Sequence, residues 1–256
     1  MLTVGLVQPS LTTSFIGREI TYYLSTDSTN ADLWALVDKG EAVPGQVVIT
    51  DDQRSGKGRQ GRRWFSAAGL GLTFSTLLRP ELPPERLGLL SLGMGVAVVD
   101  ALALEGAKAR LKWPNDIVWE GRKLGGILAE SRMTNEVPVV VIGVGINVNE
   151  QITDFPKELH PAAVSVYMLL GKPIQRELLL AGILNRFEGL LEDSLNAVTS
   201  YWQERCDHLG HPVRFHGPDG QLEGRFTGVN PVGQGLIEIG SEIHEVTAGD
   251  LDLKSE

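Results

Sequence analysis

The sequence predicts an α+β protein built around a largely antiparallel sheet. Strand-like segments at 46–50 and 72–79 are followed by one long helix over 85–104 that is apolar on nearly every face. Three or four further strand-like segments then fill 109–149, and tight turns such as Glu120-Gly121 join them. Strands that follow one another through short turns pair antiparallel, whereas a parallel sheet needs long crossovers between its strands. The order of elements therefore excludes an alternating βαβ protein.

Local patterns support each of these elements. The segment 28–40 opens with Ser, Thr and Asn, which favour helix starts, and it closes on Gly40, so it predicts a short helix. Pro84 stands where helices begin and precedes the long apolar helix. In the strand at 72–79, Leu72, Phe74 and Leu78 are expected on one face. The segment between the first two strands is thus a strand-to-strand connection.

The predicted secondary structure changes from helical to β towards the end of the sequence. Residues 176–205 have a helical pattern with a break near Asn196. Beyond Gly210, short alternating strands are separated by glycine and Asn-Pro turns. We therefore predict a main domain over 1–208 and an all-β module over 209–256. A module of this size buries too little apolar surface to be stable alone, so it should pack against the main domain.

Composition limits the classes of function. The 256 residues carry a net charge of −9, which argues against broad contact with a nucleic-acid backbone. The single cysteine, Cys206, cannot form an internal disulfide, which fits a reducing cytoplasm. The longest uncharged apolar run, 87–99, is too short to cross a bilayer before Asp100 interrupts it. No histidine has metal-ligand spacing, so we expect the five histidines to be structural: His160, His208, His211, His216 and His244.

A basic loop, residues 52–66, stands out in this acidic chain. Its residues 56–61 match the pattern G-x-G-x-x-G, but no helix follows and no acidic residue ends a second strand about 20 residues on, so a dinucleotide fold is excluded. Kinase and P-loop motifs are also missing from the sequence. Glycines let a backbone approach an anion, and the loop supplies the charges of Lys57, Arg59, Arg62 and Arg63. It is either an anion-binding flap that orders on its ligand or a solvated surface loop.

Four blocks together resemble the biotin protein ligases. They are 24–30 (LSTDSTN), 52–66 (DQRSGKGRQGRRWFS), 112–130 (KWPNDIVWEGRKLGGILAE) and 143–149 (GVGINVN). The resemblance implies the fold of the biotin ligase and class II aminoacyl-tRNA synthetase catalytic domain, with a mixed, largely antiparallel sheet. It also implies that the terminal module is a small SH3-like β-barrel.

The resemblance further implies a two-step reaction. Biotin would react with ATP to give biotinyl-5'-AMP and pyrophosphate, and a lysine of a biotin carboxyl carrier protein would then accept the biotinyl group. ATP and Mg²⁺ would serve as co-substrate and metal. We expect no nucleic-acid or membrane partner, and a homodimer is compatible with the sequence. Some relatives carry an additional DNA-binding domain, whereas residues 1–25 show no helix-turn-helix pattern, so we expect a ligase without a repressor role.

Site residues are carried over block by block. Lys123, expected to bridge the biotin carboxylate and the α-phosphate, and Arg59, expected to hold the adenylate phosphate, are the predicted catalytic pair. Asp116 is the candidate metal ligand, although the metal ligands stay open. The predicted biotin-binding residues are Ser28, Thr29, Asn30, Gln53, Gly56, Lys57, Gly58, Arg59, Lys123, Gly125 and Gly126. The predicted nucleotide-binding residues are Arg59, Arg62, Trp64, Lys112, Asn115, Asp116, Lys123 and Asn147.

Several alternatives remain open. Ser28 can serve as a helix cap as well as a ligand contact. Asn147 can equally be a buried asparagine that satisfies backbone groups. The family loop usually has arginine where this chain has Lys57, which keeps the charge but loses the planar fork. A lipoate protein ligase of the same fold is the nearest alternative function, and a non-catalytic small-molecule or nucleic-acid binding module is the second.

Overall fold

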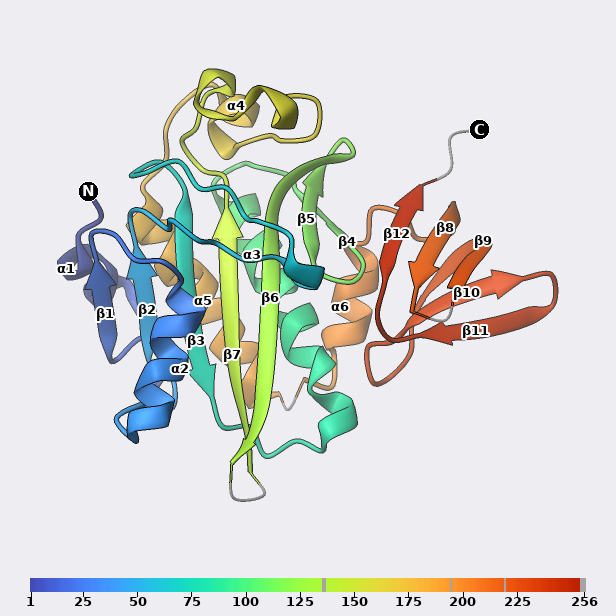
Figure 1. Cartoon of the computed structure of the whole chain (residues 1–256), viewed down its shortest axis with the longest axis horizontal. Coiled ribbons are helices and arrows are strands. Elements are labelled where there is room, and N and C mark those ends of the chain that lie inside the picture. Colours follow the sequence, from blue (N-terminus) through green and yellow to red (C-terminus); the bar gives the residue numbers. More distant parts are fainter. Residues whose placement is uncertain (135–136, 194, 219, 254–256) are drawn as a thin grey trace.

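The main sheet is mixed and largely antiparallel. The computed structural model describes residues 1–256 apart from 135–136, 194, 219 and 254–256. Seven strands run in the order β1-β2-β3-β7-β6-β5-β4 (Figure 1), and β1 pairs parallel with β2 while the other neighbours pair antiparallel. The strands are β1 (Ile20–Tyr23), β2 (Val47–Thr50), β3 (Leu72–Leu78), β4 (Arg110–Lys112), β5 (Asp116–Trp119), β6 (Arg122–Thr134) and β7 (Val137–Ile146).

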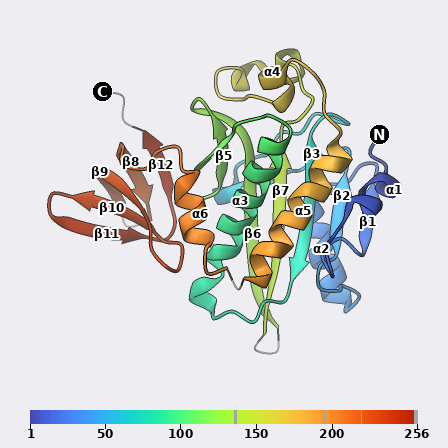
Figure 2. The ribbon, with the colours of Figure 1, turned by 180° about the vertical axis from the view of Figure 1, so that it is seen from behind.

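Helices cover both faces of this sheet. The helix α2 (Thr29–Lys39) lies on the front face in Figure 1, whereas α3 (Gly88–Leu104) and α5 (Arg176–Glu192) lie side by side behind it, as Figure 2 shows. Every residue of β3 is consequently buried. Leu72, Phe74 and Leu78 belong to the core with α3 and α5, while Leu77 packs with α2. The predicted face of this strand is confirmed.

Local signals fix the ends of several elements. The Ser28 hydroxyl accepts a hydrogen bond from the Ala31 N–H at 3.4 Å, and Gly40 closes α2 in the left-handed region at φ 74°. At the predicted tight turn between β5 and β6, Glu120 and Gly121 both have positive φ. That conformation suits a two-residue hairpin because its twist matches the strands.

The long apolar helix is the central core helix. A 3₁₀ turn over Pro84–Arg86 precedes it and α3 proper begins at Gly88, three residues later than predicted. The uncharged apolar run 87–99 is too short to cross a membrane, but the whole helical segment Pro84–Leu104 is long and apolar enough to do so. In this fold 67% of the segment's apolar stretch is buried, against the sheet and α5.

The helical region at 176–205 consists of α5 and α6 (Val198–Glu204), so the break near Asn196 is confirmed. The other helical segments are short. They are α1 (Val4–Val7), α4 (Val166–Leu170) and the 3₁₀ turns Gln8–Ser10, Arg59–Gly61, Pro84–Arg86, Ile152–Asp154 and Lys157–Leu159.

The terminal module is an antiparallel sheet in the order β11-β10-β9-β8-β12. Its outer strands β11 and β12 do not pair with each other, so the described strands form an open sheet and the predicted barrel is not confirmed. The strands are β8 (Pro212–Gly217), β9 (Gly220–Val229), β10 (Gly235–Ile239), β11 (Glu242–Val246) and β12 (Asp250–Leu253). The predicted module 209–256 also includes positions 219 and 254–256, which lie outside the described residues.

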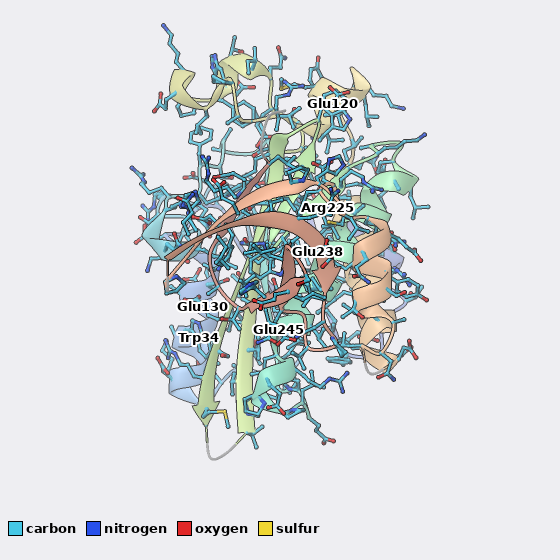
Figure 3. All side chains as sticks on the ribbon, turned by 90° about the vertical axis from the view of Figure 1, so that its right-hand side faces the viewer. Trp34, Glu120, Glu130, Arg225, Glu238 and Glu245 are labelled. Carbon is cyan, nitrogen blue, oxygen red and sulfur yellow. The ribbon has the colours of Figure 1, made fainter. Side chains whose placement is uncertain are left out.

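The two sheets share one core. The rings of Trp113 and Phe215 lie 6.0 Å apart, and Trp202 meets Phe226 edge-on at 6.3 Å. Cys206, predicted to be free, is free and buried in the same core. Figure 3 looks onto this end of the molecule, where Glu238 and Arg225 face each other on β10 and β9. The terminal module therefore packs against the main domain, as its size predicts.

One carboxylate is buried without a hydrogen-bond partner for one of its oxygens. Glu150 follows β7 and is 1% exposed, and its Oε2 has no partner. Loss of hydration disfavours the charged form, so burial raises the pKa of Glu150 to about 7. The folded protein thus holds this proton more tightly than the unfolded chain does.

A raised pKa makes stability depend on pH in a defined direction. The contribution of Glu150 is complete below its unfolded pKa of about 4.5 and is lost as pH rises through about 7. We expect Glu150→Gln to gain stability relative to wild type over that interval, by up to about 3 kcal/mol. Urea unfolding of both proteins from about pH 4.5 to 8 measures this difference. A difference that stays constant with pH would contradict the assignment.

Candidate functional site

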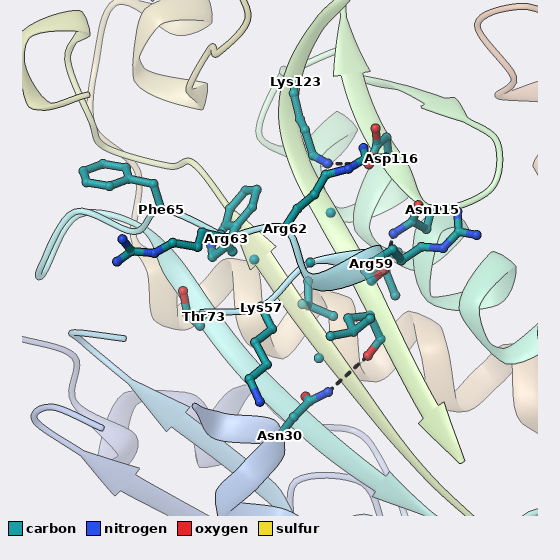
Figure 4. A pocket seen from close by; sticks show the side chains of 18 of the residues that line it. Asn30, Lys57, Arg59, Arg62, Arg63, Phe65, Thr73, Asn115, Asp116 and Lys123 are labelled. Atoms are coloured by element: carbon teal, nitrogen blue, oxygen red, sulfur yellow. Dashed lines mark hydrogen bonds and ion pairs between the residues drawn. The ribbon is translucent and has the colours of Figure 1, made fainter. Parts of the chain in front are cut away.

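A cavity of about 650 Å³ lies on the face of the main sheet that carries α2. The basic loop runs in front of β7 and β6 (Figure 1), and its residues 57–59 and 62–65 line the cavity. Figure 4 shows the side chains of this space: Lys57 points towards Asn30 at one end, and Lys123 meets Asp116 at the other. All four motif blocks supply lining residues, so the fold brings together segments far apart in the sequence.

Two glycines of β7 make room for side chains above the sheet. A Cβ atom at Gly145 would lie 2.5 Å from the indole of Trp64, and one at Gly143 would collide with the amide of Asn30. Trp64 therefore packs against the strand, and its indole N–H is buried without a protein partner. A bare backbone at these two positions defines the floor of the cavity.

Hydrogen-bonded polar groups line the α2 end of the cavity. The Oε1 atom of Gln53 accepts a hydrogen bond from the Thr29 N–H at 3.0 Å, which fixes one side of its amide. The Thr29 hydroxyl lies 2.6 Å from that of Ser75, which donates to Asn30 Oδ1 at 2.6 Å. Asn30 Nδ2 donates to Glu130 Oε2 at 2.7 Å. These side chains are held in one orientation before any ligand arrives.

The basic loop has an ordered backbone. Lys57 and Arg63 form an antiparallel bridge, and the Gly58 N–H donates to the Arg62 carbonyl at 2.7 Å. Between them, Gln60 and Gly61 both have positive φ, at 56° and 74°. The loop is therefore a tight reversal that presents its side chains on both sides.

Strand β12 meets the cations of the loop. Arg59 Nη1 donates to the Gly249 carbonyl at 3.1 Å and approaches Asn115 Oδ1 at 3.5 Å, and Arg62 pairs with Asp250. Burial lowers the pKa of Arg59, while Asp250 and Asp116 act in the opposite direction. The terminal module thus contributes directly to the site.

Lys123 and Asp116 form an ion pair with 2.5 Å between Nζ and Oδ1. The Lys123 side chain lies across Gly126, where a Cβ would come within 3.4 Å of Nζ. Its Nζ is also 6.0 Å from the centre of the Trp64 ring. The Lys123 side chain therefore lies between Asp116, Gly126 and Trp64. It is 41% exposed, so an anion that enters the cavity can contact it.

Asn115, Lys112 and Asn147, which line the cavity near Lys123, differ in their hydrogen-bond and ion-pair partners. Asn115 Nδ2 donates to the Ile127 carbonyl at 2.5 Å, and Lys112 lies 3.5 Å from Asp252. Asn147 is 4% exposed and its Nδ2 donates to the Val164 carbonyl at 3.0 Å. In the free protein Asn147 thus joins the 163–166 segment to β7, which is the backbone-satisfying role that the sequence left open.

Two predicted site residues do not line the cavity. A Cβ at Gly56 would lie 2.7 Å from both Gln53 Nε2 and the Trp64 carbonyl, and one at Gly125 would lie 2.7 Å from the Gly145 carbonyl. Both glycines allow close backbone packing behind the lining. The other predicted residues, Ser28, Thr29, Asn30, Gln53, Lys57, Gly58, Arg59, Arg62, Trp64, Lys112, Asn115, Asp116, Gly126, Lys123 and Asn147, line it.

Sequence reasoning missed several lining residues. Asp250 and Asp252 come from the terminal module, and their alternation along β12 is an ordinary strand pattern. Trp34 and Asp38 of α2 meet Arg132 of β6 at the far end, where the guanidinium stacks 4.1 Å from the Trp34 ring centre. Helical spacing in α2 was the one available sign of a shared face. The segment after β7 adds Phe155, Leu159, Ala162 and Ala163.

The charge of the cavity is opposite in sign to that of the chain. Seven cationic and five acidic side chains line it, whereas the whole protein carries −9. This arrangement suits an anionic ligand. Among the residues that the structure describes, no three His, Cys, Asp or Glu side chains gather as a metal site. Asp116, which lines the cavity beside Lys123, is a carboxylate that could meet a Mg²⁺ ion held mainly by phosphate oxygens and water.

Comparisons with known proteins agree with this site. Residues 22–147 match the model of the Biotin/lipoate A/B protein ligase family. The biotin–[acetyl-CoA-carboxylase] ligase of Mycobacterium tuberculosis is 34% identical over 91% of this chain and 88% of its own length. The bifunctional ligase/repressor of Bacillus subtilis is 32% identical over 95% of this chain and 76% of its own. A structure of the biotin protein ligase from Aquifex aeolicus in complex with biotin and ATP has a TM-score of 0.80 and 29% identity, covering 93% and 100% of the chains.

The glycine floor gives a direct test of the cavity's geometry. We expect Gly145→Ala to displace Trp64, to shift the tryptophan emission and to lower the free energy of unfolding by about 1–3 kcal/mol, because the new methyl overlaps the indole. Urea denaturation followed by fluorescence measures both effects. The matched control is Gly189→Ala in α5, where a Cβ meets nothing within 4 Å and stability should rise by up to about 1 kcal/mol. Equal behaviour of the two variants would refute the packing of Trp64 on β7.

Proposed function

The chain belongs to the biotin protein ligase family, and we propose that it activates biotin with ATP as biotinyl-5'-AMP and transfers the biotinyl group to a lysine of a biotin carboxyl carrier protein. The observation that carries this proposal is the convergence of the four motif blocks on one cavity. Lys123 and Arg59 both line that cavity, together with the polar cluster on α2. Each block thus has a place in a single reaction site.

The first step joins two anions. A biotin carboxylate oxygen forms a bond to the α-phosphorus of ATP, and the bond from that phosphorus to the bridging oxygen breaks, releasing pyrophosphate. Charge stays on oxygens throughout, so fixed cations and correct positioning provide most of the acceleration. Lys123 is placed to contact both reacting groups once its pairing with Asp116 is shared with the ligand. Arg59 would hold the phosphate of the adenylate.

Mg²⁺ bound with ATP would neutralise part of the triphosphate charge. Asp116 and Asn115 lie beside Lys123 and Arg59 and are the groups of this chain that would meet the ion or its waters. In the second step the acceptor amine attacks the acyl carbon, the bond to the adenylate oxygen breaks and AMP leaves. The basic loop would keep water from the adenylate until that amine arrives.

The polar α2 end of the cavity favours biotin over lipoate. The ureido ring of biotin offers N–H donors and a carbonyl acceptor, whereas the dithiolane ring of lipoate offers no comparable groups. Polar atoms of the buried Ser28, Thr29 and Asn30 and of the half-buried Gln53 lie there. A site built for hydrogen bonds rejects a ligand that lacks them, because its polar groups would stay buried and unpaired.

We also propose a division into a catalytic domain over 1–208 and a terminal SH3-like module over 209–256. The change from the mixed sheet to the second sheet supports this division. The acidic charge and the free Cys206 support a cytoplasmic ligase without a nucleic-acid partner. A homodimer and the absence of a repressor role stay predictions.

A pyrophosphate-release assay tests the function itself. With ATP and Mg²⁺ we expect release on adding biotin and little on adding lipoate, and calorimetric titration with each acid should show the same preference. Release with lipoate alone would support the alternative ligase. Binding of biotin without any pyrophosphate would support a non-catalytic binding module.

Lys123→Ala should abolish adenylation while retaining much of the biotin affinity. The lysine meets charge that develops in the transition state, so we expect pyrophosphate release to fall by at least about 100-fold. The control Lys108→Ala removes an exposed lysine outside the cavity and should leave the rate unchanged. Unchanged release in Lys123→Ala would remove this residue from the mechanism.

Arg59→Gly should weaken the hold on the intermediate rather than prevent its formation. We expect biotinyl-AMP to escape about tenfold faster or more, because a charge-assisted contact to phosphate is lost. Rapid filtration with labelled biotin measures the escape. The control is Arg54→Gly, an exposed arginine of the same loop that pairs with Asp27 and does not line the cavity. Equal retention in both variants would contradict the role of Arg59.

A further inference from the structure

The connection that carries the basic loop is fastened at both ends by one side chain. It leaves β2 at Asp51 and enters β3 after Gly71. Arg176, the first residue of α5, places Nη2 2.8 Å from Asp51 Oδ1 and donates from Nη1 to the Gly71 carbonyl at 2.8 Å. A single guanidinium therefore holds the two ends of a segment of about 20 residues.

This fastening is buried and lies outside the cavity. Arg176 and Asp51 are 6% and 5% exposed. The second oxygen of Asp51 accepts hydrogen bonds from the Leu2 N–H at 2.9 Å and the Tyr22 hydroxyl at 2.8 Å. Burial alone would raise the pKa of Asp51, but these two donors and the charge of Arg176 outweigh it and lower that pKa. Asp51 is thus charged and held in place, and Arg176 supplies the opposite charge that stabilises it in the core.

Backbone contacts continue the fastening along the return of the connection. The Gly69 N–H donates to the Asp51 carbonyl at 2.8 Å, and the Asn149 N–H donates to the Leu70 carbonyl at 3.2 Å. Gly71 also faces the buried Glu150, whose Oε1 would lie 2.8 Å from an added Cβ. The ends of the connection are consequently rigid, while its middle is rich in glycine.

Rigid ends decide where the cations of the loop can lie. Lys57 and Arg59 lie between the two ends that Arg176 contacts. The positions that these side chains can occupy over β6 and β7 therefore depend on how far apart the ends are and how they are oriented. Without the guanidinium, the Oδ1 atom of Asp51 and the Gly71 carbonyl would lose this buried partner, while Oδ2 would keep its two donors. Leaving such groups without a partner is costly, and the cost is relieved when the two ends separate.

We propose that Arg176 is a positioning residue for the basic loop: by joining Asp51 to Gly71 from the opposite face of the sheet, it sets the place at which the loop cations meet the adenylate. This inference rests on the proposed function for its consequence in catalysis. The state of the loop in the free protein is a separate consequence that needs no ligand.

The test compares Arg176→Met with Arg186→Met. Arg186 lies on the same helix and pairs with Asp100 at 2.9 Å. Neither residue belongs to the connection that carries the basic loop, so the control variant loses an ion pair without changing a contact of that connection. Limited trypsin digestion without ligand reports cleavage after Lys57, Arg59, Arg62 and Arg63. We expect Arg176→Met to be cut there about tenfold faster than wild type or more, because the loosened loop opens more often, and Arg186→Met at the wild-type rate. Both digestions are run where unfolding curves show the proteins to be folded.

Biotinyl-AMP escape is measured on the same proteins. We expect faster escape from Arg176→Met, with Arg176→Lys in between because lysine keeps the charge beside Asp51 but cannot hold both ends. If Arg176→Met does not fold, Tyr22→Phe removes one hydrogen bond to Asp51 without touching α5, and it should increase loop cleavage by a smaller factor.

The outcomes separate this inference from the function. Loop cleavage equal to that of Arg186→Met, in a folded Arg176→Met or in both Arg176→Lys and Tyr22→Phe, would overturn the positioning role. A wild-type protein that makes no biotinyl-AMP would overturn the proposed function but leave the cleavage result to decide the role of Arg176. Faster cleavage with unchanged adenylate escape would limit Arg176 to a structural role.

Discussion

The repulsion between two anions is the constraint on which this site depends. A carboxylate and a triphosphate have to meet in a protein whose own charge is −9, so the fold must gather cations locally. It does so by bringing a glycine-rich loop over the sheet and by placing Lys123 across Gly126. Like charges in a small space repel one another when no anion is present. The carboxylates Asp116 and Asp250, paired with Lys123 and Arg62, offset that repulsion in the free protein.

The bare backbone of β7 is the second requirement, because cations are useful only where the ligand can approach. Gly143 and Gly145 let Asn30 and Trp64 lie directly on the strand, and the ligand can then be enclosed between the sheet and the loop. These glycines weaken an isolated strand. The stability that the glycines lose is offset because β7 is the central strand of the sheet. It pairs along most of its length with β3 on one side and β6 on the other.

The sequence predicts those parts of the structure that short-range rules decide. Gly40 ends α2, Glu120-Gly121 turns the β5–β6 hairpin, and the apolar pattern places α3 in the core. Contacts between distant segments are not predictable in this way. Asp250 meets Arg62 across 188 positions, and Arg176 reaches Gly71 across 105. Both contacts depend on how the fold brings distant segments together, and neither Asp250 nor Arg176 stands in a distinctive local pattern.

The one departure of the loop from its family illustrates the difference between backbone and side-chain roles. Lys57 stands where arginine is usual, yet its backbone forms the bridge to Arg63 that shapes the loop, and any residue can supply that bridge. Its side chain points towards Asn30 at the polar end of the cavity (Figure 4), whereas Arg59 contacts Asn115 and Gly249 through its Nη1 atom. Lysine keeps the positive charge at the first place but loses the planar fork, which Arg59 retains at the second. The backbone bridge between Lys57 and Arg63 is therefore compatible with lysine at this position.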